Sequence, residues 1–380
     1  MENFQLLPLQ TYFMKLQKQV ATRYAAFVLW TTAPSYFRAF NYKNSEREIC
    51  SKLFIRLGRN TLIDFIWFVN FVFNWRKVHV HVDVMEIREF KIPAPWGHIA
   101  IKVWGDYRNQ PIICLHGLHD NAGTFDALIP LLPQNFYYIC VDLPGHGLSD
   151  HFPSSLPLEF TTYLFAVSVV IEHFNRQKYI VMGHSFGGRL LTLFTQIYPE
   201  SVLKIITLDS GYILPITPKE YVYSLKEGYQ TVKKIRSFES EECPSYSYDA
   251  IVDKVANGRV AGVLTNETAE HIAKRMIRKI GDDKYQFTID RRLRSIIYPC
   301  FTEQYVDKIF EKFPIRCPAL AIFASEILQM FEEYEKIHKF SQLPNIEFHE
   351  FDGHHHSHQT NPELIAPILN KFLLKPISKL

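Results

Sequence analysis

A serine flanked by glycines is the first residue whose surroundings indicate chemistry, because residues 183–188 read Gly-His-Ser-Phe-Gly-Gly. The apolar run Tyr179–Met182 before this motif predicts a buried strand, and the segment Phe186–Tyr198 after it predicts a helix. On such a strand-to-helix turn a serine has a strained backbone that exposes its hydroxyl group, and the glycines allow neighbouring chains to approach closely. We therefore predict that Ser185 is a nucleophile.

The motif Leu-His-Gly-Leu at residues 115–118 ends another predicted strand, Ile112–Leu115. When a serine attacks a carbonyl group, two backbone N–H groups must stabilise the negative charge that develops on the oxygen. One belongs to the residue after the nucleophile, and the other to the loop after an earlier strand. We assign these oxyanion donors to Phe186 and Leu118. A plain turn at the end of the strand is the alternative interpretation of the second motif.

A histidine-rich tract at residues 352–358, Asp-Gly-His-His-His-Ser-His, follows a predicted strand, Ile346–Phe351, and precedes a predicted terminal helix, Pro362–Leu373. A serine nucleophile needs a histidine that takes its proton and then returns it to the leaving group. Such a tract can also bind metal, but no nearby cluster of Asp, Glu or Cys residues completes a metal site. We therefore predict a general base in this tract, no metal ion and no other cofactor.

The elements that must position these residues alternate between strands and helices from about Val84 onward. Continuous apolar runs are typical of strands that are buried on both faces of a parallel sheet. The predicted strands are Val84–Ile92, His98–Trp104, Ile112–Leu115, Tyr137–Asp142, Tyr179–Met182, Lys204–Leu208, Ala319–Phe323 and Ile346–Phe351. The predicted helices are Leu158–Phe174, Phe186–Tyr198 and Pro362–Leu373. This alternation predicts an α/β fold with a mostly parallel central sheet flanked by helices.

The alternation is interrupted once, between two late strands, by a charge-rich segment of helical character at about residues 212–315. One helix of this segment is predicted to begin after Thr265, which caps it, and to end at Gly281. Ligands of open parallel sheets bind at the carboxyl ends of the strands, where such an insertion lies. We therefore predict a helical lid.

Residues 1–83 are basic and hydrophobic and are predicted to form an appendage to a main domain at residues 84–380. The apolar stretch at residues 61–75 is shorter than the about 20 residues of a membrane-spanning helix and contains Asp64, Asn70 and Asn74. A helix that lies on a membrane surface and a helix that packs on the main domain or on a partner are both open interpretations. A mitochondrial targeting segment and a membrane anchor are further alternatives.

The last three residues, Ser378, Lys379 and Leu380, match the C-terminal signal that the peroxisomal import receptor binds. We therefore predict a peroxisomal location with this receptor as a partner. A mitochondrion, a cytoplasmic vesicle and a membrane are the alternatives, because of the N-terminal appendage.

The composition, with 47% hydrophobic and 21% charged residues, is that of a folded globular protein. The net charge of +3 gives no sign of the concentrated positive charge that nucleic-acid binders carry, so we predict no nucleic-acid partner. The six cysteines are scattered without a CxxC pair, which favours a reducing compartment over a disulfide framework.

Four longer strings of the main domain stand at residues 95–104 (PWGHIAIKVW), 116–125 (HGLHDNAGTF), 142–147 (DLPGHG) and 183–188 (GHSFGG). Together with the segments at 246–249 and 287–293 of the predicted lid, they resemble the serine hydrolase-like proteins of animals, the group that includes the insect hydrolase kraken. The resemblance runs from about Val84 to the end of the chain and implies the α/β-hydrolase fold. Residues 1–83 fall outside it.

The resemblance also bears on the base. The motif Gly-x-His-x-x-His of the family, shortly before Pro362, implies that the base is His355 rather than His354 or His356. His358 then matches a second histidine of the family.

The acidic member of the triad departs from the usual pattern of the fold. Most such hydrolases have an aspartate shortly after the strand that is Ala319–Phe323 here, but this chain has Ile327 at that place. Glu326 is one alternative acid. Asp209, at the end of the strand before the predicted lid, is our first choice, although it can also serve only as a structural carboxylate that caps the next loop.

A serine in the place where epoxide hydrolases of this fold use a carboxylate indicates an acyl-serine reaction. We therefore expect hydrolysis of an ester or thioester bond in a small-molecule acyl substrate, with lipid-derived substrates as one class. The alternative is a degenerate hydrolase that binds a lipid or a protein without turnover, because the usual triad acid is missing.

Overall fold

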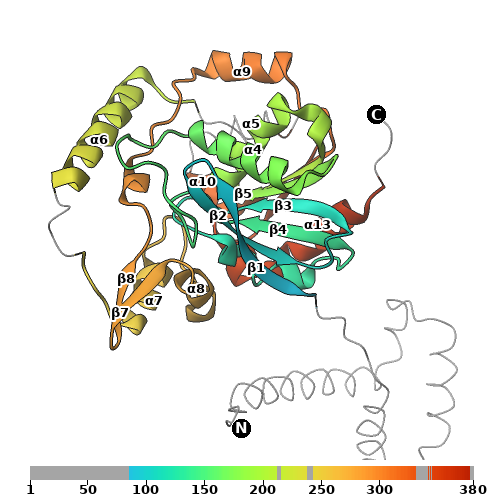
Figure 1. Ribbon diagram of the computed structural model, residues 1–380. Helices are drawn as coiled ribbons and strands as arrows, with labels where there is room; N and C mark the ends of the chain where they lie inside the picture. Colours follow the sequence, from blue (N-terminus) through green and yellow to red (C-terminus); the bar gives the residue numbers. More distant parts are fainter. Residues whose placement is uncertain are drawn as a thin grey trace, which may run out of the picture. The chain divides into compact units, whose positions relative to one another are not determined.

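The computed structural model describes residues 85–211, 215–237, 243–330 and 345–376, together with Ser341 and Leu343 (Figure 1). The predictions for residues 1–83, including the stretch at 61–75, and for the tail Ser378–Leu380 lie outside the described residues. Within the described part, no helix is long and apolar enough to cross a membrane.

An eight-stranded sheet forms the centre of the described chain. Its strands are β1 (Ile87–Ala94), β2 (Gly97–Trp104), β3 (Gln110–Leu115), β4 (Phe136–Val141), β5 (Tyr179–His184), β6 (Val202–Leu208), β9 (Ala319–Ala324) and β10 (Ile346–Phe351). They lie in the order β1-β2-β4-β3-β5-β6-β9-β10. β2 pairs antiparallel with β1 and with β4, and all other neighbours pair parallel. The predicted mostly parallel α/β fold is therefore confirmed.

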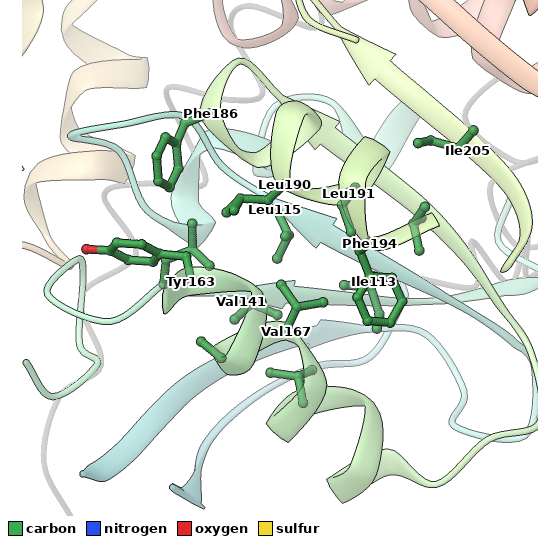
Figure 2. Packing of buried hydrophobic residues seen from close by; sticks show 14 of the residues in the cluster. Ile113, Leu115, Val141, Tyr163, Val167, Phe186, Leu190, Leu191, Phe194 and Ile205 are labelled. Carbon is green, nitrogen blue, oxygen red and sulfur yellow. The ribbon is translucent and has the colours of Figure 1, made fainter. Parts of the chain in front are cut away.

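Helices cover both faces of this sheet, because its central strands are apolar on both sides. Helices α4 (Thr162–Phe174) and α5 (Phe186–Ile197) contribute Tyr163 and Leu190 to a buried cluster with Ile113 and Leu115 of β3 (Figure 2). The alternate residues of β3, such as Ile112, belong to a second cluster on the other face with helix α13 (Ala366–Leu374). Because successive side chains of a strand point to opposite faces of the sheet, β3 contributes residues to a hydrophobic core on each face.

The strand order reverses next to β3, which creates the place for a site. The chain continues from β3 to its neighbour β4 and then crosses to β5 on the other side of β3. At such a switch point the loops that follow the two parallel strands leave the carboxyl edge in opposite directions and open a crevice. The motifs at residues 115–118 and 183–188 both lie at the ends of these strands.

The segment between β6 and β9 contains helices and a hairpin. It comprises α6 (Pro218–Ser237), α7 (Tyr248–Asn257), α8 (Asn266–Ala273), the strands β7 (Ile277–Gly281) and β8 (Lys284–Phe287), and α9 (Glu303–Lys312). In Figure 1, α7, α8, β7 and β8 lie together, apart from α6. We call α7, α8, β7 and β8 the hairpin unit; its helices bury their apolar residues in a small core of their own.

The prediction of one helix from Thr265 to Gly281 is wrong in its end. Thr265 caps α8 as predicted, since its side chain accepts a hydrogen bond from the N–H of Thr268, but α8 ends at Ala273. Gly281 instead ends β7 and starts a tight turn that contains Asp283 with a positive φ of 43°. The physical reason is that glycine and aspartate residues at 281–283 specify a hairpin turn between two short strands.

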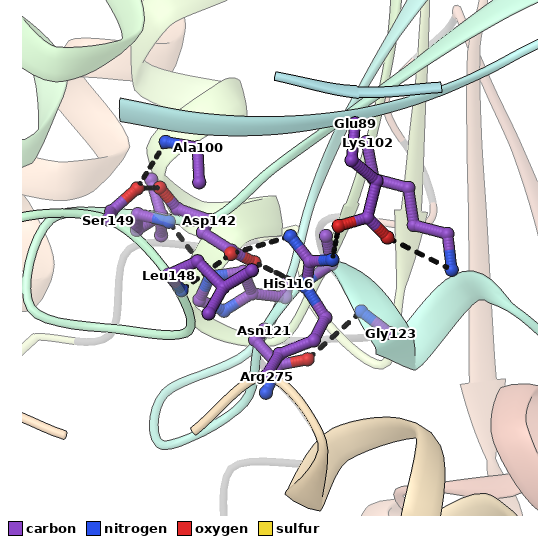
Figure 3. A network of polar contacts seen from close by, with 12 residues as sticks. Glu89, Ala100, Lys102, His116, Asn121, Gly123, Asp142, Leu148, Ser149 and Arg275 are labelled. Atoms are coloured by element: carbon purple, nitrogen blue, oxygen red, sulfur yellow. Dashed lines mark hydrogen bonds and ion pairs between the residues drawn. The ribbon is translucent and has the colours of Figure 1, made fainter. Parts of the chain in front are cut away.

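A polar network, buried at Arg275 and Asp142 and exposed at Glu89, joins the hairpin unit to the sheet (Figure 3). Nη2 of Arg275, just after α8, lies 2.8 Å from Oδ2 of Asp142, and its Nη1 lies 2.6 Å from Oε2 of Glu89 on β1. Lys102 on β2 lies 3.9 Å from Glu89 and 2.7 Å from Asp126. The hairpin unit is thus attached by ion pairs to Glu89 on β1 and to Asp142, which directly follows β4.

Candidate active site

Ser185 lies on the turn between β5 and α5 with a strained backbone, φ 49° and ψ −115°. The N–H of Ser185 donates to Leu208 O at 3.0 Å, and Ser210 Oγ donates to Ser185 O at 2.7 Å. A Cβ atom on Gly183 would lie 2.6 Å from the backbone of Gly187, so only glycine fits there. The turn is therefore held in the strained form by the next strand and by close backbone packing.

The loop after β3 passes directly over this serine. A Cβ atom on Gly117 would lie 3.3 Å from Cβ of Ser185. His116 fixes the loop: its Nδ1 lies 2.7 Å from Gly117 O, and its Nε2 accepts from the N–H of Leu143 at 3.0 Å. Nδ1 therefore carries the ring proton, and burial lowers the pKa of His116, which keeps it neutral.

The geometry of the peptide bond then orients Leu118. The carbonyl of Gly117 points to His116, and in a trans peptide the following N–H points in the opposite direction. The N–H of Leu118 is therefore turned away from His116. Phe186 is the first residue of α5, where backbone N–H groups lack partners within the helix. Both predicted oxyanion donors thus belong to segments that lie next to Ser185.

Asp209 and His355 are brought together, although one lies before the insertion and the other near the end of the chain. His355 Nδ1 lies 3.2 Å from Asp209 Oδ2, and the N–H of Ala324 donates to Asp209 Oδ1 at 2.6 Å. A carboxylate only accepts hydrogen bonds, so Nδ1 of His355 carries the proton and Nε2 is left with a lone pair. Asp209 has a φ of 48° at the end of β6, and its side chain is 3% exposed.

Glu326, the other predicted acid, is placed differently. It lies on the short helix α10 (Ser325–Met330) with an exposed side chain, and its backbone N–H donates to Gly353 O. Of the two alternatives, the structure pairs Asp209 with the histidine.

The remaining histidines of the tract have other partners. His354 Nδ1 accepts from the N–H of His356 at 3.1 Å. His356 Nε2 donates to Val260 O at 3.2 Å, and burial lowers the pKa of His356 to about 2. His358 Nε2 lies 2.8 Å from Thr124 Oγ1. Of these four histidines, His355 is the one that contacts a carboxylate directly.

His184 connects the serine turn to the histidine tract, a role that the sequence did not indicate. Its Nε2 donates to His355 O at 2.9 Å, and its ring centroid lies 4.5 Å from that of His355. A small pocket lies beside the Asp209–His355 pair. Its lining consists of His184, Leu208, Asp209, Ile322, Phe351, His355, His358 and Ile365. The serine motif contains His184, but nothing in the motif shows that this ring faces the base.

The side chains of the histidine tract are of the kind that can bind a metal ion. Within the described ranges, no group of three or more His, Cys, Asp or Glu side chains is arranged to hold a metal ion. The imidazoles of the tract instead contact a backbone carbonyl, a hydroxyl group and a carboxylate.

Comparisons with known proteins agree with the fold. The family model described as the alpha/beta hydrolase fold matches residues 110–233. The chain is similar to the "Serine hydrolase-like protein" of Danio rerio, with 31% identity over 293 residues that cover 75% of this chain and 88% of the relative. It is also similar to "Serine hydrolase-like protein 2" of Homo sapiens, with 30% identity over 317 residues, covering 76% of this chain and 94% of the relative.

Among solved structures, the thioesterase domain from the curacin biosynthetic pathway is similar with a TM-score of 0.62 and 17% sequence identity. The likeness covers 75% of this chain and 99% of that domain, and it concerns the fold. The relatives of Danio rerio and Homo sapiens, in contrast, share sequence over most of their length. On this basis the chain is a hydrolase that belongs to the serine hydrolase-like family of the α/β-hydrolase fold.

Proposed function

We propose that the protein hydrolyses carboxylic ester or thioester bonds through an acyl intermediate on Ser185. The observation that carries this proposal is the hydrogen-bonded pair formed by Asp209 and His355. The carbonyl of His355 accepts a hydrogen bond from His184, the residue directly before the strained Ser185. In this arrangement Ser185 is the nucleophile, His355 is the general base and acid, and Asp209 orients the imidazole.

In the first step, Ser185 Oγ forms a bond to the carbonyl carbon while its proton passes to Nε2 of His355. The N–H groups of Phe186 and Leu118 stabilise the oxygen that becomes negative. The bond to the leaving oxygen or sulfur then breaks, and Nε2 returns the proton to that atom. A water molecule repeats both steps on the acyl-serine and releases the acid. Asp209 stabilises the imidazolium in each half of the reaction.

The alternative function is a binding module without turnover. The observation in its favour is that Ile327, after β9, stands where such hydrolases usually have the triad acid. Asp209, at the end of the neighbouring strand β6, supplies a carboxylate to His355, so the lack of an acid after β9 does not argue against turnover. A small-molecule ester or acyl compound, with lipid-derived acyl groups as one class, is therefore the proposed substrate.

A fluorophosphonate probe on the purified full chain tests the proposal. We expect labelling of the wild type and none of Ser185→Ala. The control is Ser168→Ala, whose hydroxyl donates to Leu164 O within α4 and which should label like the wild type. A panel of p-nitrophenyl esters and acyl-CoA thioesters then measures turnover. A correctly folded wild type that neither labels nor turns over any member of the panel would support the binding module instead.

For location we propose the peroxisome, through binding of Ser378, Lys379 and Leu380 to the import receptor. The support is the match of this tripeptide at the C-terminal position. A contact of residues 61–75 with a membrane surface is proposed on the basis of their apolar composition between basic residues. Deletion of residues 378–380 should release a tagged protein into the cytosol. Retention of the truncated protein in an organelle would indicate that the N-terminal segment contains the targeting signal instead.

A further inference from the structure

Another buried carboxylate, that of Asp120, lies on the loop that carries Leu118. Its side chain is 1% exposed and accepts hydrogen bonds from Thr124 Oγ1 and from Gln359 Nε2, both at 3.0 Å. The guanidinium of Arg259, from the hairpin unit's α7–α8 loop, lies 3.7 Å away. A buried charge with such a set of partners keeps its loop firmly in place, because removal of any partner leaves buried polar groups without a hydrogen bond.

His358 is connected to Asp120 by hydrogen bonds through Thr124. Its Nε2 lies 2.8 Å from Thr124 Oγ1. The threonine hydroxyl has a single proton, which it donates to Asp120, so it must accept from His358, and Nε2 of His358 carries its ring proton. Burial lowers the pKa of His358 well below the usual value, so the ring remains neutral with this proton in place.

The imidazole of His358 is also connected to the base, His355, through the ring of His184. The ring of His358 lies 4.0 Å from the ring of His184, which in turn lies 4.5 Å from that of His355 and donates to its carbonyl. A continuous row of contacts therefore runs from Asp120 on the oxyanion loop, through Thr124, His358 and His184, to the base. Its two ends carry the two parts of the site that must keep a fixed distance during catalysis.

We propose that Asp120, Thr124 and His358 are positioning residues that hold the loop of His355 in place against the loop of Leu118. The inference rests on the proposed function, and it assigns a role to His358, the last histidine of the tract, which the mechanism itself does not use. A loss of this link shifts the base relative to the nucleophile and the oxyanion donors. Misplacement by about 1 Å costs on the order of 100-fold in rate.

The hairpin unit contributes to the same arrangement. Ala261 O accepts from the N–H of His355 at 3.3 Å, and the neighbouring carbonyl, Val260 O, accepts from His356. Arg259 compensates the charge of Asp120. The loop at residues 259–261 therefore contacts both ends of the link, which gives the insertion a way to affect the base without touching substrate.

The test uses isosteric and conservative variants of the full chain with an ester that the wild type turns over. Thr124→Val removes the hydroxyl at constant volume, and His358→Leu removes the donor. We expect kcat per titrated active site to fall about 10- to 100-fold in both, with KM changed less than about twofold. His358→Gln keeps an N–H donor near the position of Nε2 and should retain kcat within about threefold of the wild type.

The matched control is Thr195→Val, which removes another buried threonine hydroxyl, one that donates to Leu191 O within α5. Its kcat should equal that of the wild type even where its melting temperature falls. Full kcat in Thr124→Val would overturn the inference, as would equal losses in His358→Gln and His358→Leu. Should His358→Leu fail to fold, Thr124→Val decides alone. An inactive wild type contradicts the proposed function instead, so the two failures are distinguishable.

Discussion

Arg275 and Asp142 form a buried ion pair across 133 positions of sequence, with Nη2 and Oδ2 2.8 Å apart. Asp142 directly follows β4 and also accepts from the N–H groups of Ala122 and Leu148. The pair therefore ties the hairpin unit to the carboxyl edge of the sheet, where the loop over the serine begins.

Removal of Arg275 should destabilise the protein strongly. In Arg275→Met the carboxylate of Asp142 stays buried without its cation, a change that costs about 3 to 5 kcal/mol of unfolding free energy. Urea denaturation at pH 7 measures it. Arg108→Met is the control, since its pair with Asp106 is exposed and exposed pairs contribute about 1 kcal/mol or less. Equal midpoints for both variants would contradict the importance of the buried pair.

The triad acid can be identified by a pair of amide variants. Asp209→Asn keeps the shape of the side chain but loses the charge that stabilises the imidazolium, so kcat should fall about 10⁴-fold. Glu326→Gln changes an exposed side chain and should retain kcat within about twofold. Steady-state kinetics on one ester measure both. A loss in Glu326→Gln with full activity of Asp209→Asn would reverse the assignment.

A methyl group at the serine turn should not be tolerated. The Cβ atom of Gly183→Ala would lie 2.6 Å from the backbone of Gly187, and overpacking against backbone costs about 1 to 3 kcal/mol or more. We expect a lower melting temperature together with loss of probe labelling. At Gly281, in the hairpin turn, the nearest atom would lie 3.6 Å away. Gly281→Ala should therefore melt and label like the wild type, and identical behaviour of the two variants would refute this packing argument.

Acid should destabilise the protein through its buried histidines. In the folded state, burial is the main cause of a lowered pKa in five buried histidines: His116, His146, His184, His356 and His358. A folded-state pKa below the unfolded value means that the unfolded chain binds more protons below about pH 6.5, so unfolding becomes easier as pH falls. The stability that these neutral rings contribute is complete above that pH.

Urea midpoints at pH 7.5, 6.5, 5.5 and 4.5 test the acid effect. Each such histidine should cost about 1.4 kcal/mol per pH unit below about 6.5, until its folded-state pKa is reached. His356→Gln removes one of the five and should make the dependence shallower by about that amount. A midpoint that does not change between pH 7.5 and 5.5 would show that these rings are not held neutral.

The local parts of the fold and of the site could be predicted from sequence. The strand before Ser185 and the helix after it follow from periodicity and turn chemistry within about twenty residues of chain. The end of α8 could not be predicted, because Gly281 fits both a helix end and a hairpin turn, and only the pairing of β7 with β8 decides between them.

The sequence placed Asp209 before Glu326 as the triad acid but could not decide between them, because the choice depends on the pairing of strands. Asp209 reaches His355 because β6 lies beside β9, with the N–H of Asp209 bound to Ile322 O and Ala324 N–H bound to its carboxylate. The link from Asp120 to Gln359 joins residues 239 positions apart. Contacts of this kind leave no periodic pattern in the chain, so they appear only once the sheet is assembled.

The three proposed triad members follow different strands of the sheet, and this placement affects how activity would be lost on heating. Ser185 and Asp209 follow β5 and β6, which are paired in the middle of the sheet, whereas His355 comes from the chain beyond the edge strand β10. Local opening of the loop that carries His355, with α13 still packed in its core, would displace the imidazole while the rest of the scaffold stays assembled. Inactivation should therefore precede global melting and reverse on cooling, and amide exchange should be faster around residue 355 than along β5.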